Sequence, residues 1–212
     1  MAKKNLNDFE RDQLVEITNI GAGNAATALS QLVGKKITFS VPDLMASKIE
    51  NAHNFFGNSE DIMTVVMVKL LGDIKGTMLL MFPSKSAISI VDLLSERLYQ
   101  KSNSEILNEF GRSALKEIGN ILAGSFMAAL FKFLDLSVLQ SVPDVTTDKV
   151  GSIMDVVFTN IIETQINDIL ALKISLIIEG NGVESRLFLL FDPKATAIIL
   201  EAVEKKYEGI NN

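Results

Sequence analysis

The chain has 212 residues, of which 48% are hydrophobic and 22% charged, a composition typical of a globular protein rather than a disordered one. Its net charge is −6, and no segment gathers lysine and arginine into a stripe, so we expect no nucleic-acid partner. The absence of cysteine excludes disulfides, a thiolate nucleophile and a cysteine-ligated metal.

The charged N-terminal segment and the length of the longest apolar run predict a cytoplasmic protein without membrane contact. Residues 1–13 carry charges every few positions and do not resemble a signal peptide. The longest apolar run, 121–131, is too short to span a bilayer and predicts a buried helix. The only histidine, His53, lies in a polar stretch expected to be a solvated loop, and we expect no bound metal.

The chain contains an internal repeat. A shift of 101 residues places Asn19 on Asn120, Glu16 on Glu117 and Pro42 on Pro143 without a gap. The second half is longer beyond that point, which predicts an insertion over 148–163 with helical apolar spacing, whereas the polar 46–60 of the first half is expected to be a loop.

Both halves predict the same order of elements. Each begins with a helix whose capping box we place at 7–10 or 102–105. The expected strands of the first half are 36–41, ending at the proline, then 62–71 and 75–82; those of the second half are 136–142, 169–178 and 184–191. An amphipathic helix closes each half, at 84–99 and 193–207.

Strands joined by tight turns predict a mixed α/β fold of the α+β kind, with a largely antiparallel sheet flanked by helices. We expect one domain over 1–212, built from two pseudo-symmetric helix-strand-hairpin-helix repeats at about 8–99 and 103–207 that share the sheet. A repeat that completes its own sheet predicts a monomer.

The candidate site residues lie on the first helix of each half. Glu16 and Asn19 are three positions apart, as are Glu117 and Asn120, so each pair shares one face of its helix. The same face carries one further polar side chain a turn earlier in each half, Asp12 and Ser113. One Glu-x-x-Asn alone indicates only a solvated surface, but its recurrence in the same register, where Thr18 and Gly119 have diverged, indicates a function.

The neighbouring Gly21-x-Gly23 pattern follows a helix rather than a strand, so it indicates close helix packing, not dinucleotide binding.

This pattern resembles the CheC, CheX and FliY chemotaxis phosphatases, over nearly the whole chain. The matching positions are Asp12, Glu16, Asn19 and Pro42, and again Ser113, Glu117, Asn120 and Pro143. Two motifs without a further carboxy-terminal domain are similar to CheC rather than to CheX or FliY. The resemblance implies a phosphatase that removes the aspartyl phosphate of the response regulator CheY.

The implied chemistry needs no cofactor of the protein's own. Mg²⁺ is expected in the response regulator, which already holds an activated mixed anhydride, so a helper protein has only to position water in line. The resemblance implies that Asn19 and Asn120 orient this water and that Glu16 and Glu117 form an ion pair with the partner's lysine. It also implies the receptor deamidase CheD as a partner, for which the insertion at 151–162 is a candidate surface.

Two alternatives remain open from the sequence. The chain is either a non-catalytic module, like the middle domain of flagellar switch proteins, or an adaptor that acts mainly by binding CheD. A further hypothesis concerns the two sites: Asp12 places negative charge near Asn19, where an anionic phosphoryl group must approach, whereas Ser113 is neutral, so we expect the second site to be faster.

Overall fold

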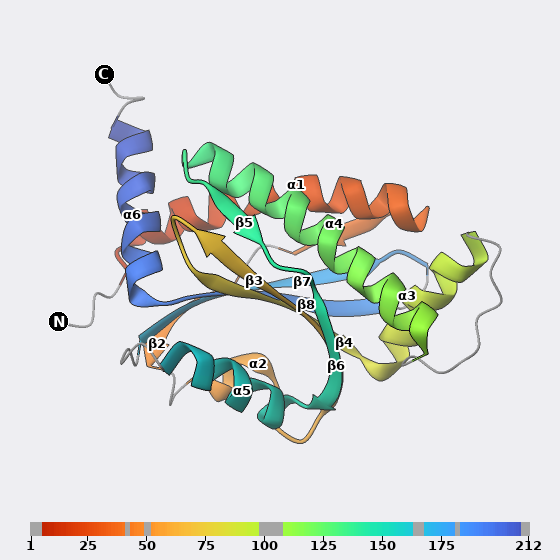
Figure 1. The fold of residues 1–212 in the computed structure, drawn as a ribbon. Helices are drawn as coiled ribbons and strands as arrows, with labels where there is room; N and C mark the ends of the chain where they lie inside the picture. The colour runs from red at the N-terminus through yellow and green to blue at the C-terminus, as the bar shows by residue number, and fades with distance from the viewer. Residues whose placement is uncertain are drawn as a thin grey trace.

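The computed structural model describes residues 6–40, 43–48, 52–97, 108–162, 168–180 and 183–208. Its elements follow one another in two similar series (Figure 1). The first series contains α1 (Asp8–Val33), β1 (Ile37–Phe39), β2 (Asp43–Lys48), α2 (His53–Phe56), β3 (Ile62–Gly72), β4 (Gly76–Pro83) and α3 (Ser84–Arg97). The second contains α4 (Glu109–Phe133), β5 (Val138–Gln140), β6 (Asp144–Lys149), α5 (Val150–Ile162), β7 (Asp168–Ile178), β8 (Val183–Phe191) and α6 (Pro193–Glu208).

All strand pairs of the sheet are antiparallel, and the strand order is symmetric. The order is β1-β7-β8-β4-β3-β5, with β2 also on β7 and β6 also on β3. The strands β1, β3 and β4 of the first series correspond to β5, β7 and β8 of the second. If each is exchanged for its counterpart, the same order results, read from the other end. Each series therefore sends its first two strands across to the hairpin of the other series. The mixed α/β fold with an antiparallel sheet is confirmed, while the duplication of an ancestral sequence stays a prediction.

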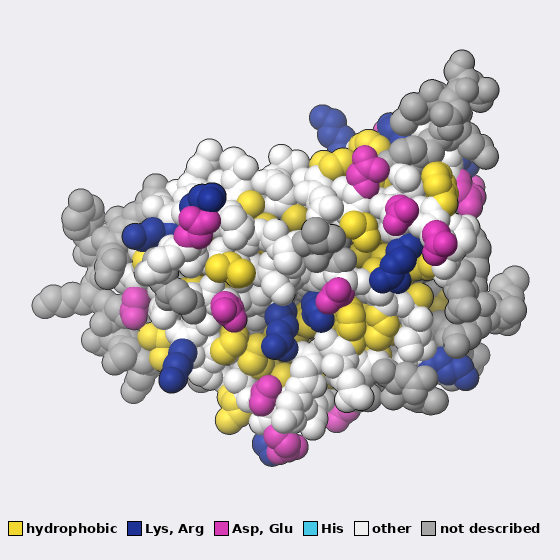
Figure 2. Space-filling model, turned by 180° about the vertical axis from the view of Figure 1, so that it is seen from behind, with side chains coloured by type: hydrophobic (Ala, Val, Ile, Leu, Met, Phe, Trp, Pro, Cys, Tyr) yellow, Lys and Arg dark blue, Asp and Glu magenta, His cyan; other side chains and the backbone are white. Residues whose placement is uncertain are grey.

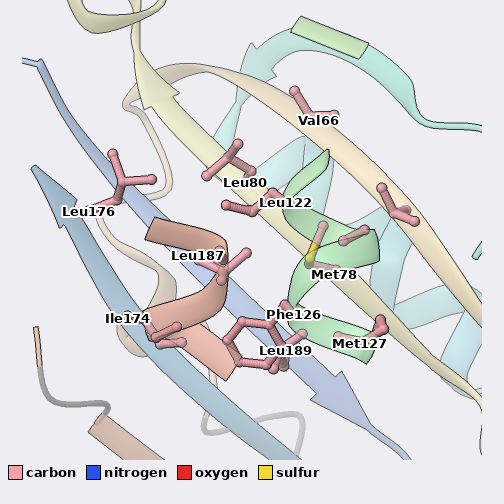
Figure 3. Close-up of a cluster of buried hydrophobic side chains, with 14 of the residues drawn as sticks. Val66, Met78, Leu80, Leu122, Phe126, Met127, Ile174, Leu176, Leu187 and Leu189 are labelled. Carbon is pink, nitrogen blue, oxygen red and sulfur yellow. The ribbon is translucent and has the colours of Figure 1, made fainter. Parts of the chain in front are cut away.

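Helices cover both faces of the sheet. In Figure 1, α1 and α4 run side by side across one face, and α5 with the short α2 lies on the other. Strand residues alternate between the two resulting cores, as the pleat requires: on β3, Val66 and Val68 join the core under α1 and α4, whereas Val65 joins the core under α5. Figure 3 shows Leu122 and Phe126 of α4 among the strand side chains of the first core.

The second core is smaller and rich in aromatic side chains. Phe56 of α2 is fully buried, with its ring centroid 5.7 Å from that of Phe158 on α5 and 4.9 Å from that of Phe188 on β8. Burying such rings is worth on the order of 2–3 kcal/mol each. The four-residue α2, too short to be stable by itself, is held in place by this packing.

The two series also form corresponding hydrogen bonds where their first strands cross over. Ser40 donates its N–H to the carbonyl oxygen of Ser175 at 2.9 Å, and its Oγ accepts from the Ser175 N–H at 3.0 Å. Ser141 makes the same two bonds with Lys69, at 2.9 and 3.0 Å. The symmetry therefore extends from the strand order to single hydrogen bonds.

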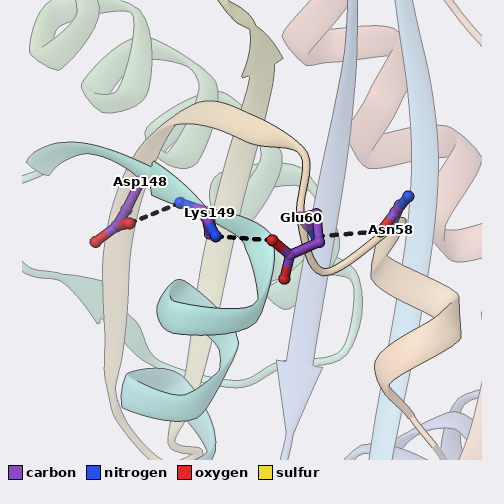
Figure 4. A network of polar contacts seen from close by, with 4 residues as sticks. All are labelled: Asn58, Glu60, Asp148 and Lys149. Carbon is purple, nitrogen blue, oxygen red and sulfur yellow. Dashed lines mark hydrogen bonds and ion pairs between the residues drawn. The ribbon is translucent and has the colours of Figure 1, made fainter.

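Polar contacts join the start of α5 to the loop before β3. Lys149 Nζ lies 2.7 Å from Glu60 Oε2, a hydrogen-bonded ion pair that raises the pKa of Lys149 (Figure 4). The backbone N–H groups of Val150 and Gly151 donate to the carbonyl oxygens of Asp61 and Ser59, both at 2.9 Å. These bonds use two of the donors that a helix start leaves without intrahelical partners.

The structure corrects two of the local predictions. The predicted loop over 46–60 is wrong in part, because Asp43–Lys48 forms β2 and His53–Phe56 forms α2, so His53 begins a helix rather than lying in a loop. The strand predicted over 136–142 was expected to end the strand structure at Pro143. The structure instead has the shorter β5 before this proline and a second strand, β6, directly after it. The inserted helix is confirmed as α5, and the predicted capping box at 102–105 lies outside the described residues.

Candidate active site

The helix α1 begins at a complete capping box. Asn7 Oδ1 accepts from the Glu10 N–H at 2.8 Å, and Glu10 Oε2 accepts from the Asn7 N–H at 2.9 Å. Two backbone donors are thereby satisfied, and helical geometry is fixed from the first turn. The polar side chains that follow are consequently held at fixed positions around the helix.

The predicted residues of the first site share the solvent-facing side of α1. Asp12, Glu16 and Asn19 are all exposed, whereas Leu14 and Ile17 between them are buried in the core under the helix. The spacing of three and four residues aligns the three polar side chains along one face, as predicted.

The second site has the same layout on α4. Its helix is capped by Asn108, whose Oδ1 accepts from the Gly111 N–H at 2.7 Å. Ser113 and Glu117 are exposed, and Asn120 is half-buried. The side chain of Arg112 anchors this end of α4 to the sheet, since its Nη2 donates to the carbonyl oxygen of Val145 on β6 at 2.9 Å.

The buried Pro143 packs beneath the second site. A Cβ atom built on Gly119, next to Asn120, would lie 3.4 Å from Pro143 Cβ and only 2.6 Å from Val66 Cγ1. The helix therefore approaches the sheet more closely at Gly119 than any larger residue permits. Pro143 accordingly supports α4 from below, while Pro42, its predicted counterpart, lies outside the described residues.

The surroundings of the two asparagines differ. In α1 the position of Gly119 is taken by Thr18, a buried residue whose hydroxyl donates to the carbonyl oxygen of Leu14. Beside α4, Gln140 of β5 donates from its Nε2 to the main-chain carbonyl oxygen of Asn120 at 3.4 Å. The helical turn of Asn120 is thus contacted at Gly119 by Val66 and at the Asn120 carbonyl by Gln140.

The two site helices pack on each other through small residues. A Cβ atom built on Gly21 would lie 3.1 Å from the Phe126 ring, so the helices meet closely there. The predicted close packing of the Gly21-x-Gly23 segment is thus confirmed for Gly21, but it is wrong for Gly23, which is exposed and has nothing within 4 Å of a built Cβ atom. The site faces point away from the contact between the helices.

Among the described residues, no group of three or more His, Asp or Glu side chains is arranged to hold a metal ion. Within the same ranges, no helix is long and apolar enough to cross a membrane. The face seen in Figure 2 intersperses basic and acidic side chains, so it carries no extended patch of one sign. The predicted site residues themselves offer carboxylate and carboxamide groups on the helix surfaces.

Family models and a protein of known function match this chain. The CheC-like family model matches residues 9–45, and the model of the chemotaxis phosphatase CheX matches residues 64–167. The chain is 32% identical over 152 residues to the CheY-P phosphatase CheC of Bacillus subtilis, covering 70% of this chain and 71% of that protein.

Solved structures share this fold. The crystal structure of Thermotoga maritima FliY is similar with a TM-score of 0.74 and 26% identity, over 95% of this chain and 98% of that one. A CheX–CheY–BeF₃–Mg²⁺ complex from Borrelia burgdorferi is similar with a TM-score of 0.54, over 84% of this chain and 98% of that one, and at 13% identity it shows the fold alone.

The antiparallel sheet and paired surface helices thus define the fold class shared by CheC, CheX and FliY. Within that class, the chain belongs to the CheC-type chemotaxis phosphatase family.

Beside the second site, no role was predicted for Gln140 from the sequence, and Gly119 was noted only as a position that differs between the halves. Gln140 occupies the position of Phe39 in the first half, and Gly119 that of Thr18. A signal was available, because the sequence departs from the repeat at Gly119, next to Asn120, and at Gln140, three residues before Pro143.

Proposed function

We propose that this protein is a phosphatase that hydrolyses the aspartyl phosphate of the response regulator CheY. The observation that carries the proposal is the pair of Glu-x-x-Asn faces, presented to solvent in the same register on α1 and α4. Similarity to a protein named as a CheY-P phosphatase supports the choice of substrate.

The chemistry requires positioning rather than a nucleophile in this protein. The Asn19 or Asn120 carboxamide enters the partner's site, accepts a hydrogen bond from water and donates one toward the phosphoryl group. The water oxygen attacks phosphorus while the bond from phosphorus to the aspartyl oxygen breaks. The carboxylate leaves with the bonding electrons, a water proton is released, and inorganic phosphate results. Mg²⁺ bound to the partner offsets the charge on the phosphoryl oxygens.

Glu16 and Glu117 fix how the partner docks. An exposed carboxylate one turn before the asparagine is placed to form an ion pair with a lysine of the response regulator. Two such contacts, one ionic and one through the asparagine, determine both the position and the rotation of the partner on the helix.

The test is the decay of radiolabelled CheY phosphate in the presence of Mg²⁺. The wild-type protein is expected to accelerate decay, and the Asn19→Ala/Asn120→Ala variant to return it to the rate in buffer. Asn24→Ala is the matched control, since Asn24 is an exposed asparagine of the same helix outside the site face and should retain full activity. Wild-type protein that leaves the decay unchanged would contradict the proposal and favour a binding role.

Binding of CheD is a separate proposal. The outer side of α5 carries Ser152, Asp155 and Val156, all exposed, and the helix at this point in the described part of the first half is only the four-residue α2. A Val156→Glu variant is expected to lose CheD in a pull-down while it retains phosphatase activity. Retention of CheD by this variant would show that the outer side of α5 is not the CheD-binding surface.

A further inference from the structure

The side chain of Gln140 lies along the turn of α4 that carries Asn120. Its Nε2 donates to the Asn120 carbonyl oxygen at 3.4 Å, and a Cβ atom built on Gly124 would lie 3.8 Å from its Oε1. In an α-helix that carbonyl already accepts from the N–H four residues on, and its second lone pair is free for a side-chain donor. Gln140 thus adds a second donor to the helical turn of Asn120.

The strand that bears Gln140 is firmly placed. Gln140 is paired with Leu70 of β3, and the adjacent Ser141 exchanges two hydrogen bonds with Lys69. On the other side of the same helical turn, Gly119 lies directly against Val66. The turn carrying Asn120 accordingly lies between the sheet at Val66 and the side chain of Gln140.

Among the described residues, the first site has no such support. The residue in the position of Gln140 is Phe39, which is partly buried against the main core and has no side-chain donor. Thr18 also replaces Gly119, and its hydroxyl bonds back to its own helix. The arrangement around Asn120 is therefore a property of one site only.

We infer that Gln140 is a positioning residue of the second site, which holds the Asn120 turn in the orientation needed for catalysis. This inference rests on the proposed function. Gln140 acts through Asn120, while docking depends on Glu117 one turn away. Its loss should therefore lower kcat and leave KM nearly unchanged.

The test isolates each site in turn. In the Asn19→Ala background, where only the second site operates, Gln140→Met removes the donor but keeps the length of the side chain. Loss of one neutral hydrogen bond is expected to lower kcat about threefold to tenfold, with KM altered less than about twofold. Gln140→Phe, which installs the residue of the first half, should have the same effect. In the Asn120→Ala background, where only the first site operates, Gln140→Met should change neither constant.

Amide hydrogen exchange gives a readout independent of activity. The Gly124 amide is expected to exchange faster in Gln140→Met than in the wild type, with an unchanged midpoint of thermal unfolding because Gln140 is exposed.

Unchanged kcat in the Asn19→Ala background, or an equal fall in both backgrounds, would overturn the inference while leaving the proposed function intact. A wild type without activity would overturn both.

Discussion

At the scale of single residues, charge distinguishes the two candidate sites. Asp12 lies on the face of Asn19, whereas the neutral Ser113 occupies this position beside Asn120. Asp12 precedes Asn19 by seven residues, or about 10 Å along the helix axis, and a like charge at this distance from an approaching phosphoryl group is worth about 0.4 kcal/mol per unit charge in water. Asn120→Ala is therefore expected to cost more activity than Asn19→Ala, and equal losses would sink this hypothesis.

An exchange of these two residues tests the cause. Asp12→Ser in the Asn120→Ala background should raise the decay rate of CheY phosphate about twofold to threefold at low ionic strength. Ser113→Asp in the Asn19→Ala background should lower it by a similar factor. Both effects should shrink as salt is added, because the Debye length falls to about 10 Å at 0.1 M. Effects that persist at high salt would have another origin.

Close packing at Gly119 gives a second residue-scale prediction. Alanine is the better helix former by about 1 kcal/mol, so a side chain that fitted would stabilise α4. The Gly119→Ala methyl group would instead lie 2.6 Å from Val66 Cγ1, and we expect a net destabilisation of about 1–3 kcal/mol. Gly23→Ala, where a Cβ atom would meet nothing within 4 Å, should be neutral or stabilising. Urea unfolding of both variants measures the difference, and equal stabilities would contradict the packing argument.

The local site geometry was predictable from the sequence because helical spacing alone fixes it. Glu117 and Asn120 had to share a face once their helix was assigned. The close approach at Gly119 was not predictable, since it depends on which strand passes beneath the helix. The N-cap of α4 could have been predicted, because the repeat shift places Asn108 on Asn7. The capping box was predicted at 102–105 instead, because the local sequence there fits the capping-box pattern.

At the scale of elements, the two site helices depend on their N-caps. Asn7→Ala and Asn108→Ala should each lower the free energy of unfolding by about 1 kcal/mol, because each leaves a backbone N–H without its partner. The caps belong to different helices, so the double variant should lose the sum of the two. Serine at either position should restore most of the loss in urea unfolding. Equal midpoints for the alanine and serine variants would rule out capping as the cause.

Strands buried on both faces were predicted to within one or two residues of their observed ends, as β3 and β8 show. The second strands of each half were only partly foreseen. β2 has the exposed residues Asp43, Ala46 and Lys48, and its pairing with β7 rather than any local pattern makes it a strand. Tertiary pairing overrides local preference in such segments.

At the scale of the whole molecule, the two halves are interlocked. The hairpin β3–β4 pairs with β5, β6 and β8 of the other half, and β7 pairs with β1 and β2. The pairing of strands between the halves could not be predicted from the sequence, because a repeat permits strands to pair either within each half or between the halves. It has a direct consequence for folding.

Fragments cut between Arg97 and Asn108 are expected not to fold as monomers, because each loses the strands that flank its hairpin. Mixed in equal amounts, they should regain the circular dichroism spectrum of the intact chain. Light scattering identifies any self-associated fragment, in which a second copy would take the place of the missing half. A monomeric fragment with a cooperative unfolding transition would contradict the interlocked arrangement.

Both borders of the sheet are broken rather than continuous. Each consists of a three-residue strand and a six-residue strand, β1 with β2 and β5 with β6, and in the second half the segment 141–143 with Pro143 separates the two. A border of this kind offers an incoming polypeptide only brief runs of unpaired N–H and C=O groups, interrupted where a proline has no N–H to give. The crossovers that tie the halves together therefore also protect this sheet against growth by strand addition, the first step toward aggregation.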